Sequence, residues 1–283
     1  MKQIQWYPGH MVKALREIKE NLKKVDIVFI LLDARLPQSS MNPKIKEVIG
    51  NKPSLILFNK SDLADQVELD KWLNYYEKEG FKSLKIDSIS GKNIRKIKTV
   101  TDEVLKPVLD REKCRGMQKR AIRTMIIGIP NVGKSTLINT LSKKKATRTG
   151  NTPGVTKAQQ WVKISSDFEL LDTPGVLWPK FDDEKVGFHL ALSGAIKDTI
   201  LPNEAVALYA HEFLKTYYPS NFMKRYHLTE ILSPLETFDQ IGRNRGALVK
   251  GNEVNYDTVY ELLLKDLRDG TLGGILFDRY QSI

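Results

Sequence analysis

The sequence has a single cysteine, Cys114, among 283 residues. One thiol cannot form an intramolecular disulfide bond, and it also excludes a cysteine-rich metal site. Long apolar runs are lacking too. The first ten residues hold no continuous hydrophobic region of a secretory signal, and no later segment is long and apolar enough to span a bilayer. We therefore expect a soluble cytoplasmic protein that does not engage a membrane.

Positive charge is abundant and unevenly distributed along the chain. The formal net charge is +11, which suggests a polyanionic partner. Residues 197–283 are slightly acidic, with 10 Lys and Arg against 12 Asp and Glu, so the whole positive excess lies in residues 1–196. The length allows one α/β domain of ordinary size and a smaller second domain.

Two continuous apolar runs predict buried parallel strands whose carboxyl ends carry polar residues. The first covers residues 27–32 and ends at Asp33, and the second covers residues 54–58 and leads into Asn59. Before them, apolar residues at helical spacing predict a basic amphipathic helix over residues 12–24. Further helices are expected at residues 67–79, 94–109, 204–214 and 257–267, and further strands at residues 84–86, 124–127, 160–164 and 168–171.

Two changes in character divide the chain. Residues 106–123 hold seven basic and two acidic residues and are punctuated by Pro107 and Gly116, and we interpret them as the join between two halves of the first domain. After Gly194 the pattern becomes mainly helical, with Asn203 as the expected cap of the next helix. The predicted domains are residues 1–195, an α/β domain that includes the basic helix, and residues 196–283, an α-helical domain.

The segment Gly128-Ile-Pro-Asn-Val-Gly-Lys-Ser135 has the spacing of a phosphate-binding loop, and it follows an expected strand and opens an expected helix. Its glycines let backbone N–H groups surround the β-phosphate, Lys134 can span the β- and γ-phosphates, and Ser135 can offer its hydroxyl group to Mg²⁺. The alternative is a glycine turn beside a surface lysine. The nucleotide-binding residues expected here are Asn131, Val132, Gly133, Lys134, Ser135 and Thr136.

A second motif, Asn59-Lys-Ser-Asp62, is suited to reading guanine. The Asp62 carboxylate can accept hydrogen bonds from N1–H and from the 2-amino group of guanine, whereas adenine lacks this donor pair. Asn59 and Lys60 are expected to brace the loop and cover the base. Ser88 and Ile89, in a Ser-Ile-Ser turn after the next strand, are expected to supply a backbone N–H to guanine O6, although such a turn is common in proteins.

A third motif, Asp172-Thr-Pro-Gly175, ends an apolar strand. There the Asp172 carboxylate can hold a Mg²⁺-bound water, and the Gly175 N–H can meet the γ-phosphate. Thr156, in the polar loop at residues 151–156, is the candidate second hydroxyl ligand of Mg²⁺. Loss of the γ-phosphate would release both loops, which makes them an order–disorder switch. The bound species expected are GTP or GDP together with Mg²⁺.

The order of these motifs indicates a circular permutation. The guanine-reading motif precedes the phosphate loop, whereas in small GTPases of the Ras type the phosphate loop comes first. The predicted fold class is α/β, a circularly permuted P-loop GTPase domain with a mainly parallel sheet and helices on both faces, followed by a small α-helical domain.

Together with Trp6-Tyr-Pro-Gly-His-Met11 and Asp33-Ala-Arg-Leu-Pro37, these motifs resemble those of the circularly permuted bacterial GTPases, specifically the ribosome biogenesis GTPase A family. The resemblance covers nearly the whole chain, with the helical tail matched by length and character alone. It implies a role in late assembly of the large ribosomal subunit, with GTP hydrolysis triggered on the particle. The implied partners are the precursor of that subunit, its rRNA and its ribosomal proteins. Nothing in the sequence requires a dimer, and we expect a monomer.

The sequence has no glutamine at the position after Gly175, where Ras-type GTPases carry the residue that orients the attacking water. Val176-Leu-Trp178 follows Gly175 instead, and none of these side chains can orient a water molecule. The resemblance assigns this work to His10, which can hydrogen-bond the water once a partner places it, with Lys134 as the other catalytic residue. Alternatively, His10 simply belongs to a turn that caps the first helix. Asn131 resembles a K⁺ ligand of related GTPases, which makes K⁺ an expected cofactor.

Ribosomal RNA would offer dense phosphate to the basic part of the chain. One alternative function is a GTP-gated RNA-binding scaffold whose hydrolysis is incidental, and another is a GTPase that acts on tRNA or in signalling. In the helical tail, Arg243 and Arg245 are either RNA contacts or part of an ordinary solvated loop. The other candidate RNA contacts are Lys19, Lys23, Lys24, Arg111, Lys113, Arg115, Lys119 and Arg120.

Overall fold

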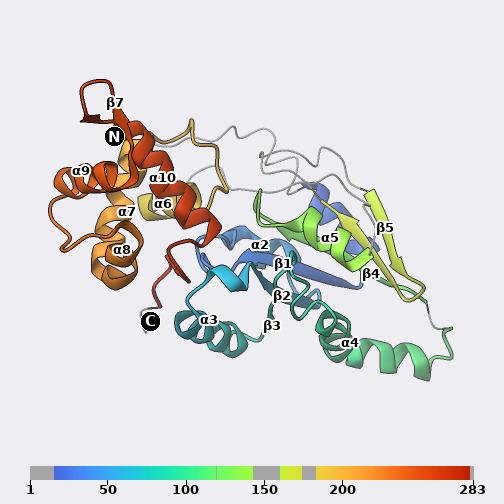
Figure 1. Cartoon of the computed structure of the whole chain (residues 1–283). Helices are drawn as coiled ribbons and strands as arrows, with labels where there is room; N and C mark the ends of the chain where they lie inside the picture. Colours follow the sequence, from blue (N-terminus) through green and yellow to red (C-terminus); the bar gives the residue numbers. More distant parts are fainter. Residues whose placement is uncertain (1–15, 119, 143–159, 174–182, 281–283) are drawn as a thin grey trace.

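A six-stranded sheet forms the centre of the molecule (Figure 1). The computed structural model describes residues 16–118, 120–142, 160–173 and 183–280. Along the sheet the strand order is β3-β2-β1-β4-β6-β5, and the strands pair in parallel except for β5, which runs antiparallel to β6. The strands are β1 (Ile27–Asp33), β2 (Ser54–Asn59), β3 (Lys82–Lys85), β4 (Ile122–Gly128), β5 (Gln160–Ser165) and β6 (Phe168–Asp172).

The chain builds the sheet outward from its middle in two directions. It runs first from β1 through β2 to the edge at β3, and α4 (Lys96–Cys114) then precedes β4, which pairs with the other side of β1. From β4 the chain continues to β5 and β6 on the opposite half. The phosphate loop therefore follows the fourth strand of the chain although that strand is central, and the predicted circularly permuted P-loop fold is confirmed.

Pro107 lies inside a helix, as the prediction of a helix over residues 94–109 requires, but the helix ends later than predicted. Helix α4 continues through Pro107 to Cys114. Proline removes one intrahelical hydrogen bond, the one to the carbonyl group of Glu103. Both residues lie on the exposed side of the helix, where water can take the place of the missing donor.

Alternating side chains of the central strands face two separate apolar layers. In β1, Phe29 and Leu31 belong to a layer that includes residues of α4 and α5 (Lys134–Ser142), whereas Ile30 and Leu32 belong to a layer with residues of α2 (Pro43–Ile49) and α3 (Gln66–Lys78). Residues 16–21 are helical and continue into the 3₁₀ turn η1 (Leu22–Lys24), which adds to the second layer. Helices thus cover both faces, as predicted.

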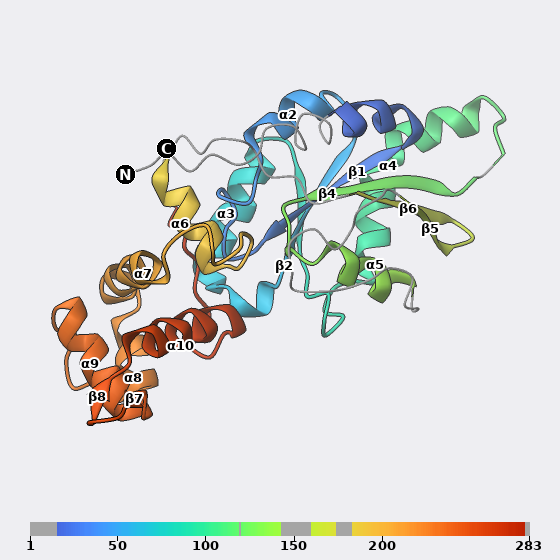
Figure 2. The same cartoon turned by 90° about the horizontal axis from the view of Figure 1, so that it is seen from above.

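A mainly helical region follows the sheet and lies at the end opposite β5 (Figures 1 and 2). Its elements are α6 (Glu184–Leu192), α7 (Asn203–Tyr217), α8 (Pro219–Tyr226), α9 (Pro234–Arg245), β7 (Leu248–Val249), β8 (Glu253–Val254) and α10 (Tyr256–Asp269). The predicted Asn203 cap is wrong, since Pro202 is the N-cap and no side chain caps this helix. The β7–β8 hairpin was not predicted, because two-residue strands are too short to show an alternating pattern.

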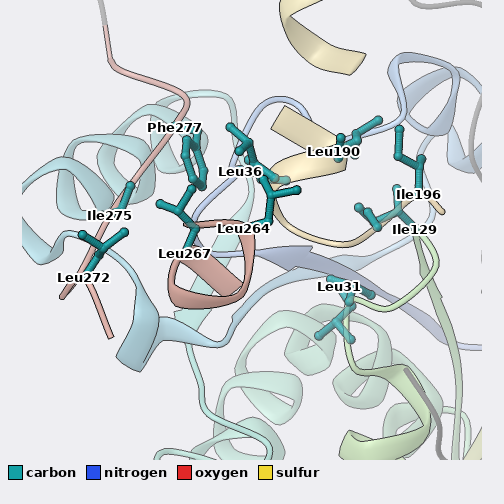
Figure 3. Packing of buried hydrophobic residues seen from close by; sticks show 14 of the residues in the cluster. Leu31, Leu36, Ile129, Leu190, Ile196, Leu264, Leu267, Leu272, Ile275 and Phe277 are labelled. Atoms are coloured by element: carbon teal, nitrogen blue, oxygen red, sulfur yellow. The ribbon is translucent and has the colours of Figure 1, made fainter. Parts of the chain in front are cut away.

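The helical region shares a continuous apolar layer with the sheet. Leu264 and Leu267 of α10 lie beside Leu36 and Phe277, close to Leu31 of β1 (Figure 3). After α10, residues 270–280 return to the sheet, where the N–H of Ile275 donates to the carbonyl oxygen of Leu63 at 3.0 Å. The division at residues 195 and 196 stays a prediction, since the hydrophobic layer crosses it.

Among the described residues, none of the helices combines the length and apolar character needed to cross a bilayer.

Candidate nucleotide-binding site

The predicted nucleotide loops gather at one edge of the sheet. The phosphate loop follows β4, Asn59–Asp62 begins at the end of β2, and the Ser88–Ile89 turn follows β3. Because β1, β2, β3 and β4 are parallel, all of their carboxyl ends meet at this edge, where ligands bind in open α/β sheets.

Two glycines allow the phosphate loop to pack closely against its neighbours. Gly133 has φ +100°, and a Cβ there would lie 2.3 Å from Nδ2 of Asn59. A Cβ on Gly128 would lie 2.5 Å from the carbonyl oxygen of Leu31. Only glycine fits such contacts without displacing the backbone or the guanine-reading loop. The φ of Asn131 is also positive, at 56°, so the loop curves as a phosphate cradle requires.

Lys134 lies at the start of α5 and is held against the loop. Its Nζ donates to the carbonyl oxygens of Gly128 at 3.1 Å and Ile129 at 2.8 Å. Val132 is buried, and Ser135 and Thr136 are half-buried in the first turn of the helix. The first-turn N–H groups have no intrahelical acceptor, so this end of α5 favours an anion.

Asn59 joins the guanine-reading loop to both neighbouring loops. Its Nδ2 donates to the carbonyl oxygen of Val132 at 2.8 Å, and its Oδ1 accepts from the N–H of Ser88 at 3.0 Å and from the Ser88 hydroxyl group at 2.8 Å. Thr140 of α5 adds a bond to the carbonyl oxygen of Ser88 at 2.7 Å. One buried amide thus holds three loops in a single arrangement.

Lys60 makes a second connection to the phosphate loop. Its backbone is left-handed, with φ 57°, and its Nζ donates to the carbonyl oxygen of Asn131 at 2.8 Å. The same Nζ lies 3.2 Å from Oδ2 of Asp33 at the end of β1. Burial lowers the pKa of Lys60, and the nearby Asp33 carboxylate opposes that change.

Asp62 presents its carboxylate from the short 3₁₀ helix η2 (Ser61–Leu63), and its side chain is exposed. Partial burial raises the pKa of Asp62 above its usual value, and the Asp87 carboxylate adds to the rise. The positive charges of Arg35 and Lys92 oppose it. The Asp62 carboxylate is therefore accessible to a nucleotide base, and its ionisation depends on the neighbouring charges.

The Ser88–Ile89 turn is shaped by Asp87. The Asp87 carboxylate accepts the N–H groups of Ile89 at 2.8 Å and Ser90 at 3.2 Å. The N–H of Ser88 donates to Asn59, so the N–H groups expected to meet guanine O6 both have protein acceptors. The Ile89 side chain is 87% exposed and points away from the core.

Several predicted residues lie beyond the described part of the chain. His10, Thr156 and Gly175 fall outside the described residues, and the Asp172 side chain is not described although its backbone ends β6. Of the three expected Mg²⁺ ligands, the structure therefore places only Ser135. A hydroxyl group at a helix N-terminus beside a phosphate-loop lysine is a chemically suitable donor for Mg²⁺. In the described segments, no cluster of three or more His, Cys, Asp and Glu side chains could hold a metal ion.

Two buried charges behind the site received no role from sequence reasoning. Asp33 and Arg35 form an ion pair with a distance of 2.8 Å between Nη2 and Oδ2. Burial opposes ionisation of Asp33, yet the charges of Arg35 and Lys60 and the hydrogen bonds from Arg35 outweigh it and hold the pKa of Asp33 well below its usual range. The available signal was the carboxylate at the end of a fully apolar strand.

Some of the candidate RNA contacts are already engaged within the chain. Arg120 bonds both carboxylate oxygens of Asp26 at 2.7 Å and also pairs with Glu112. In the tail, Arg243 pairs with Asp239 on its own helix, and Arg245 lies over the ring of Tyr226. Lys24 and Arg111 also bond within the chain, to Asn21 and to the carbonyl oxygen of Pro107. The candidates Lys19, Lys23, Lys113 and Arg115 lie exposed on the surface, and Lys119 falls outside the described residues.

Comparison with known proteins agrees with this geometry. A family model described as "50S ribosome-binding GTPase" matches residues 123–210. Ribosome biogenesis GTPase A of Bacillus pumilus is 51% identical over 99% of this chain and 99% of its own length. The probable ribosome biogenesis GTPase A of Mycoplasma pneumoniae is 34% identical over 97% of this chain and 96% of its own length.

Solved structures give the same result. The crystal structure of GNP-bound YlqF from T. maritima has a TM-score of 0.68 and 26% identity, covering 96% of this chain and 100% of its own. The GDP-bound structure of YlqF has a TM-score of 0.67, covering 93% and 99%. With a phosphate loop and a guanine-reading motif braced together at one sheet edge, the protein is a GTP-hydrolysing enzyme of ribosome biogenesis. The chain belongs to the ribosome biogenesis GTPase A family.

Proposed function

We propose that this GTPase binds the precursor of the large ribosomal subunit in the cytoplasm, that the particle activates hydrolysis, and that hydrolysis drives late assembly and release. The observation that carries the proposal is the bracing of the phosphate loop by Asn59 and Lys60. Since these hydrogen bonds join the two loops, a contact made by the particle near the γ-phosphate can act on a nucleotide that is already held in place.

In the proposed nucleotide complex, Asp62 accepts from N1–H and the 2-amino group of guanine, and a backbone N–H at Ser88 or Ile89 donates to O6. Binding requires the Ile89 N–H to share or leave its bond with Asp87. The Lys134 ammonium exchanges its two carbonyl partners for the β- and γ-phosphates. Gly133 lets the backbone approach the phosphates closely.

Ser135, Thr156 and, through water, Asp172 are the proposed ligands of Mg²⁺. When bound, Mg²⁺ neutralises charge on the β- and γ-phosphates. Ser135 lies in the first turn of α5, directly after Gly133 and Lys134 of the phosphate loop, where a helix N-terminus favours bound phosphate. The Gly175 N–H is proposed to meet the γ-phosphate and to release it after hydrolysis.

His10 is the proposed residue that orients the attacking water, since Val176 and its neighbours offer no side chain that could do so. Lys134 is the proposed catalytic cation that stabilises the charge of the transferred phosphoryl group. Particle binding would place His10, which explains why an isolated protein of this kind should be slow.

Asn131 is proposed to bind K⁺ through its amide oxygen. Its Nδ2 donates to the carbonyl oxygen of Gly194 at 2.8 Å, which orients the other end of the amide group. A monovalent cation there can supply the charge that an arginine finger supplies elsewhere. Hydrolysis in KCl should therefore exceed hydrolysis in NaCl when large subunits are present, and equal rates would contradict this assignment.

Residues 196–283 are proposed to form the domain that contacts rRNA and ribosomal proteins, and the basic surface of residues 1–196 is proposed to contact rRNA phosphates. Dense phosphate releases counterions on binding such a surface, so particle binding should weaken steeply with salt. We propose that the protein acts as a monomer in this complex.

The test is GTP turnover by the full chain, alone and with isolated large ribosomal subunits, in potassium buffer. We expect the subunits to stimulate turnover strongly in the wild type and not in His10→Ala, while His10→Ala still sediments with the particle. A variant that matures particles normally without hydrolysis would instead support the GTP-gated scaffold.

Two further results would contradict the proposal. Turnover that neither mature nor immature subunits stimulate would remove the large subunit as the activating partner. Full stimulation of His10→Ala would leave the partner in place and exclude His10 as the residue that orients water.

A further inference from the structure

Arg35 lies directly behind the nucleotide loops and cannot touch a nucleotide itself, because it is 1% exposed. It follows β1, where its Nε donates to Oδ1 of Asp33 at 2.9 Å and its Nη2 donates to Oδ2 at 2.8 Å. This two-bond geometry fixes both the carboxylate and the guanidinium group in orientation. Any influence of Arg35 on the nucleotide must therefore pass through its neighbours.

Asp33 transmits that orientation to the guanine-reading loop. Its Oδ2 lies 3.2 Å from Nζ of Lys60, which in turn bonds the phosphate-loop carbonyl of Asn131. We propose that Arg35 is a positioning residue of the guanine-nucleotide site. Through Asp33 it fixes the position of the Lys60 side chain, and it connects the ends of α6 and α10 to the two nucleotide loops. This inference rests on the guanine site assigned under Proposed function.

The connection to the helical region is made by the same guanidinium group. Nη1 of Arg35 donates to the carbonyl oxygens of Leu267 at 3.3 Å and Arg268 at 3.4 Å, at the end of α10, and Nη2 donates to that of Ser193 at 3.4 Å. Last-turn carbonyl groups lack intrahelical donors and form the negative end of the helix dipole. A buried cation is therefore well suited to hold this helix end.

The turn after α6 touches the nucleotide site a second time. Gly194, next to Ser193, accepts the bond from Nδ2 of Asn131 at 2.8 Å. Arg268 of α10 braces this turn by donating to the carbonyl oxygen of Ala191 at 2.8 Å. The ends of α6 and α10 thus reach the phosphate loop through Asn131 and the guanine loop through Arg35.

The Arg35 charge also acts on Asp62. The charged groups that bear on the Asp62 carboxylate are Asp87 and Lys92 from the turn after β3, Lys60 from its own loop, and Arg35. Of these, Arg35 is among those that favour the ionised carboxylate. Its removal therefore raises the pKa of Asp62, so the carboxylate becomes protonated, and stops accepting from the base, at a higher pH.

The test measures the affinity of the full chain for GDP carrying a fluorescent methylanthraniloyl group, as a function of pH. We expect Arg35→Met to weaken GDP binding near neutral pH about tenfold, equivalent to about 1.4 kcal/mol. The fall in GDP affinity at acidic pH, which we call the acid limb, should also move to higher pH. Arg35→Lys keeps the charge without the two-bond geometry, so it should restore the position of the limb but not the full affinity.

A matched control is Arg225→Met. Arg225 makes a similar two-bond pair with Asp266, at 2.7 and 3.0 Å, within the helical region and away from the nucleotide loops. It should lower stability and leave both the GDP affinity and the acid limb unchanged. A folded Arg35→Met protein with wild-type affinity and a wild-type pH profile would overturn the proposal.

Removing Arg35 alone leaves the buried Asp33 carboxylate with Lys60 as its remaining cationic partner and risks unfolding. The double variant Asp33→Asn with Arg35→Gln avoids that charge, and we expect it to fold and still bind GDP about tenfold more weakly, because Lys60 then lacks its anionic partner. Wild-type affinity in this folded variant would also overturn the proposal.

Hydrogen exchange gives a second readout. By reciprocity, GDP should slow amide exchange at the end of α10 in the wild type and not in Arg35→Met. No effect of GDP on α10 in the wild type would exclude the connection to the helical region. Asp62→Asn separates this outcome from the underlying assignment, since unchanged GDP affinity in that variant would reject the guanine site itself.

Discussion

At the scale of single residues, Asp62 is the side chain on which the choice of base depends. Its carboxylate is exposed at the start of η2 and can accept two hydrogen bonds from guanine. Asp62→Asn replaces one acceptor oxygen with a donor, which suits the carbonyl group at C2 of xanthine better than the 2-amino group of guanine. We expect GTP affinity to fall by about three orders of magnitude and XTP binding to appear. Competition binding with both nucleotides measures this, and unchanged preference for GTP would contradict it.

The same carboxylate makes nucleotide binding sensitive to pH. Partial burial and Asp87 raise the pKa of Asp62 above its usual value of about 3.9. Since the ionised form accepts from guanine, affinity should be complete above this raised pKa and should decline as the pH falls through it. The decline should thus begin at higher pH than for an ordinary aspartate. Titrating GDP affinity from neutral pH down through the ordinary aspartate range, about pH 4, measures the limb, and Asp62→Asn should lack it.

At the scale of elements, the phosphate loop and the Asn59 side chain fit against each other. Gly133→Ala introduces a Cβ 2.3 Å from Nδ2 of Asn59 at a φ of +100°. We expect GDP affinity to fall at least tenfold, because the displaced amide group no longer holds both loops. Calorimetric titration with GDP measures the change.

Gly80→Ala separates backbone strain from this contact. Gly80 also has positive φ, at +85°, but no atom lies within 4 Å of an added Cβ. It should cost about 1 kcal/mol of stability and leave GDP affinity unchanged. Equal affinities for the two alanine variants would show that the contact with Asn59 does not matter.

Several elements show how much of the secondary structure local sequence patterns could predict. The apolar runs predicted β1 and β2 well, since every residue of β1 is buried. The Asn203 cap was wrong because the helix begins one residue earlier than predicted, so that Asn203 is its first residue and Pro202 is the N-cap. The predicted helix over residues 94–109 runs through Pro107 as α4 does, because an exposed helix face tolerates one missing hydrogen bond.

At the scale of the whole molecule, Asp278 holds the last described segment onto the sheet. Its Oδ2 accepts the N–H groups of Gln38 at 2.7 Å and Ser39 at 2.6 Å, and its Oδ1 lies 2.7 Å from Nδ1 of His189. Asp278→Ala removes the acceptor of both N–H groups and leaves the buried His189 with only the Ser39 hydroxyl group at Nδ1. We expect a loss of about 2–4 kcal/mol in the free energy of unfolding.

Urea denaturation followed by circular dichroism measures this loss. Asp239→Ala is the control, because its pair with Arg243 is exposed on one helix face and should change stability by about 0.5 kcal/mol or less. Similar unfolding midpoints for the two variants would contradict the assigned role of Asp278.

The sequence by itself determined the identity of the site's chemical groups and their permuted order. A phosphate loop or a guanine-reading motif is built from contiguous residues, so its backbone conformation and its donors are encoded locally. Tertiary structure alone decided which groups meet. Asn59 contacts Val132 across 73 positions, and Arg35 reaches Leu267 across 232. Such contacts depend on how strands align and helices pack, which no local periodicity records. For that reason, the link between the nucleotide loops and the helical region became visible only in the fold.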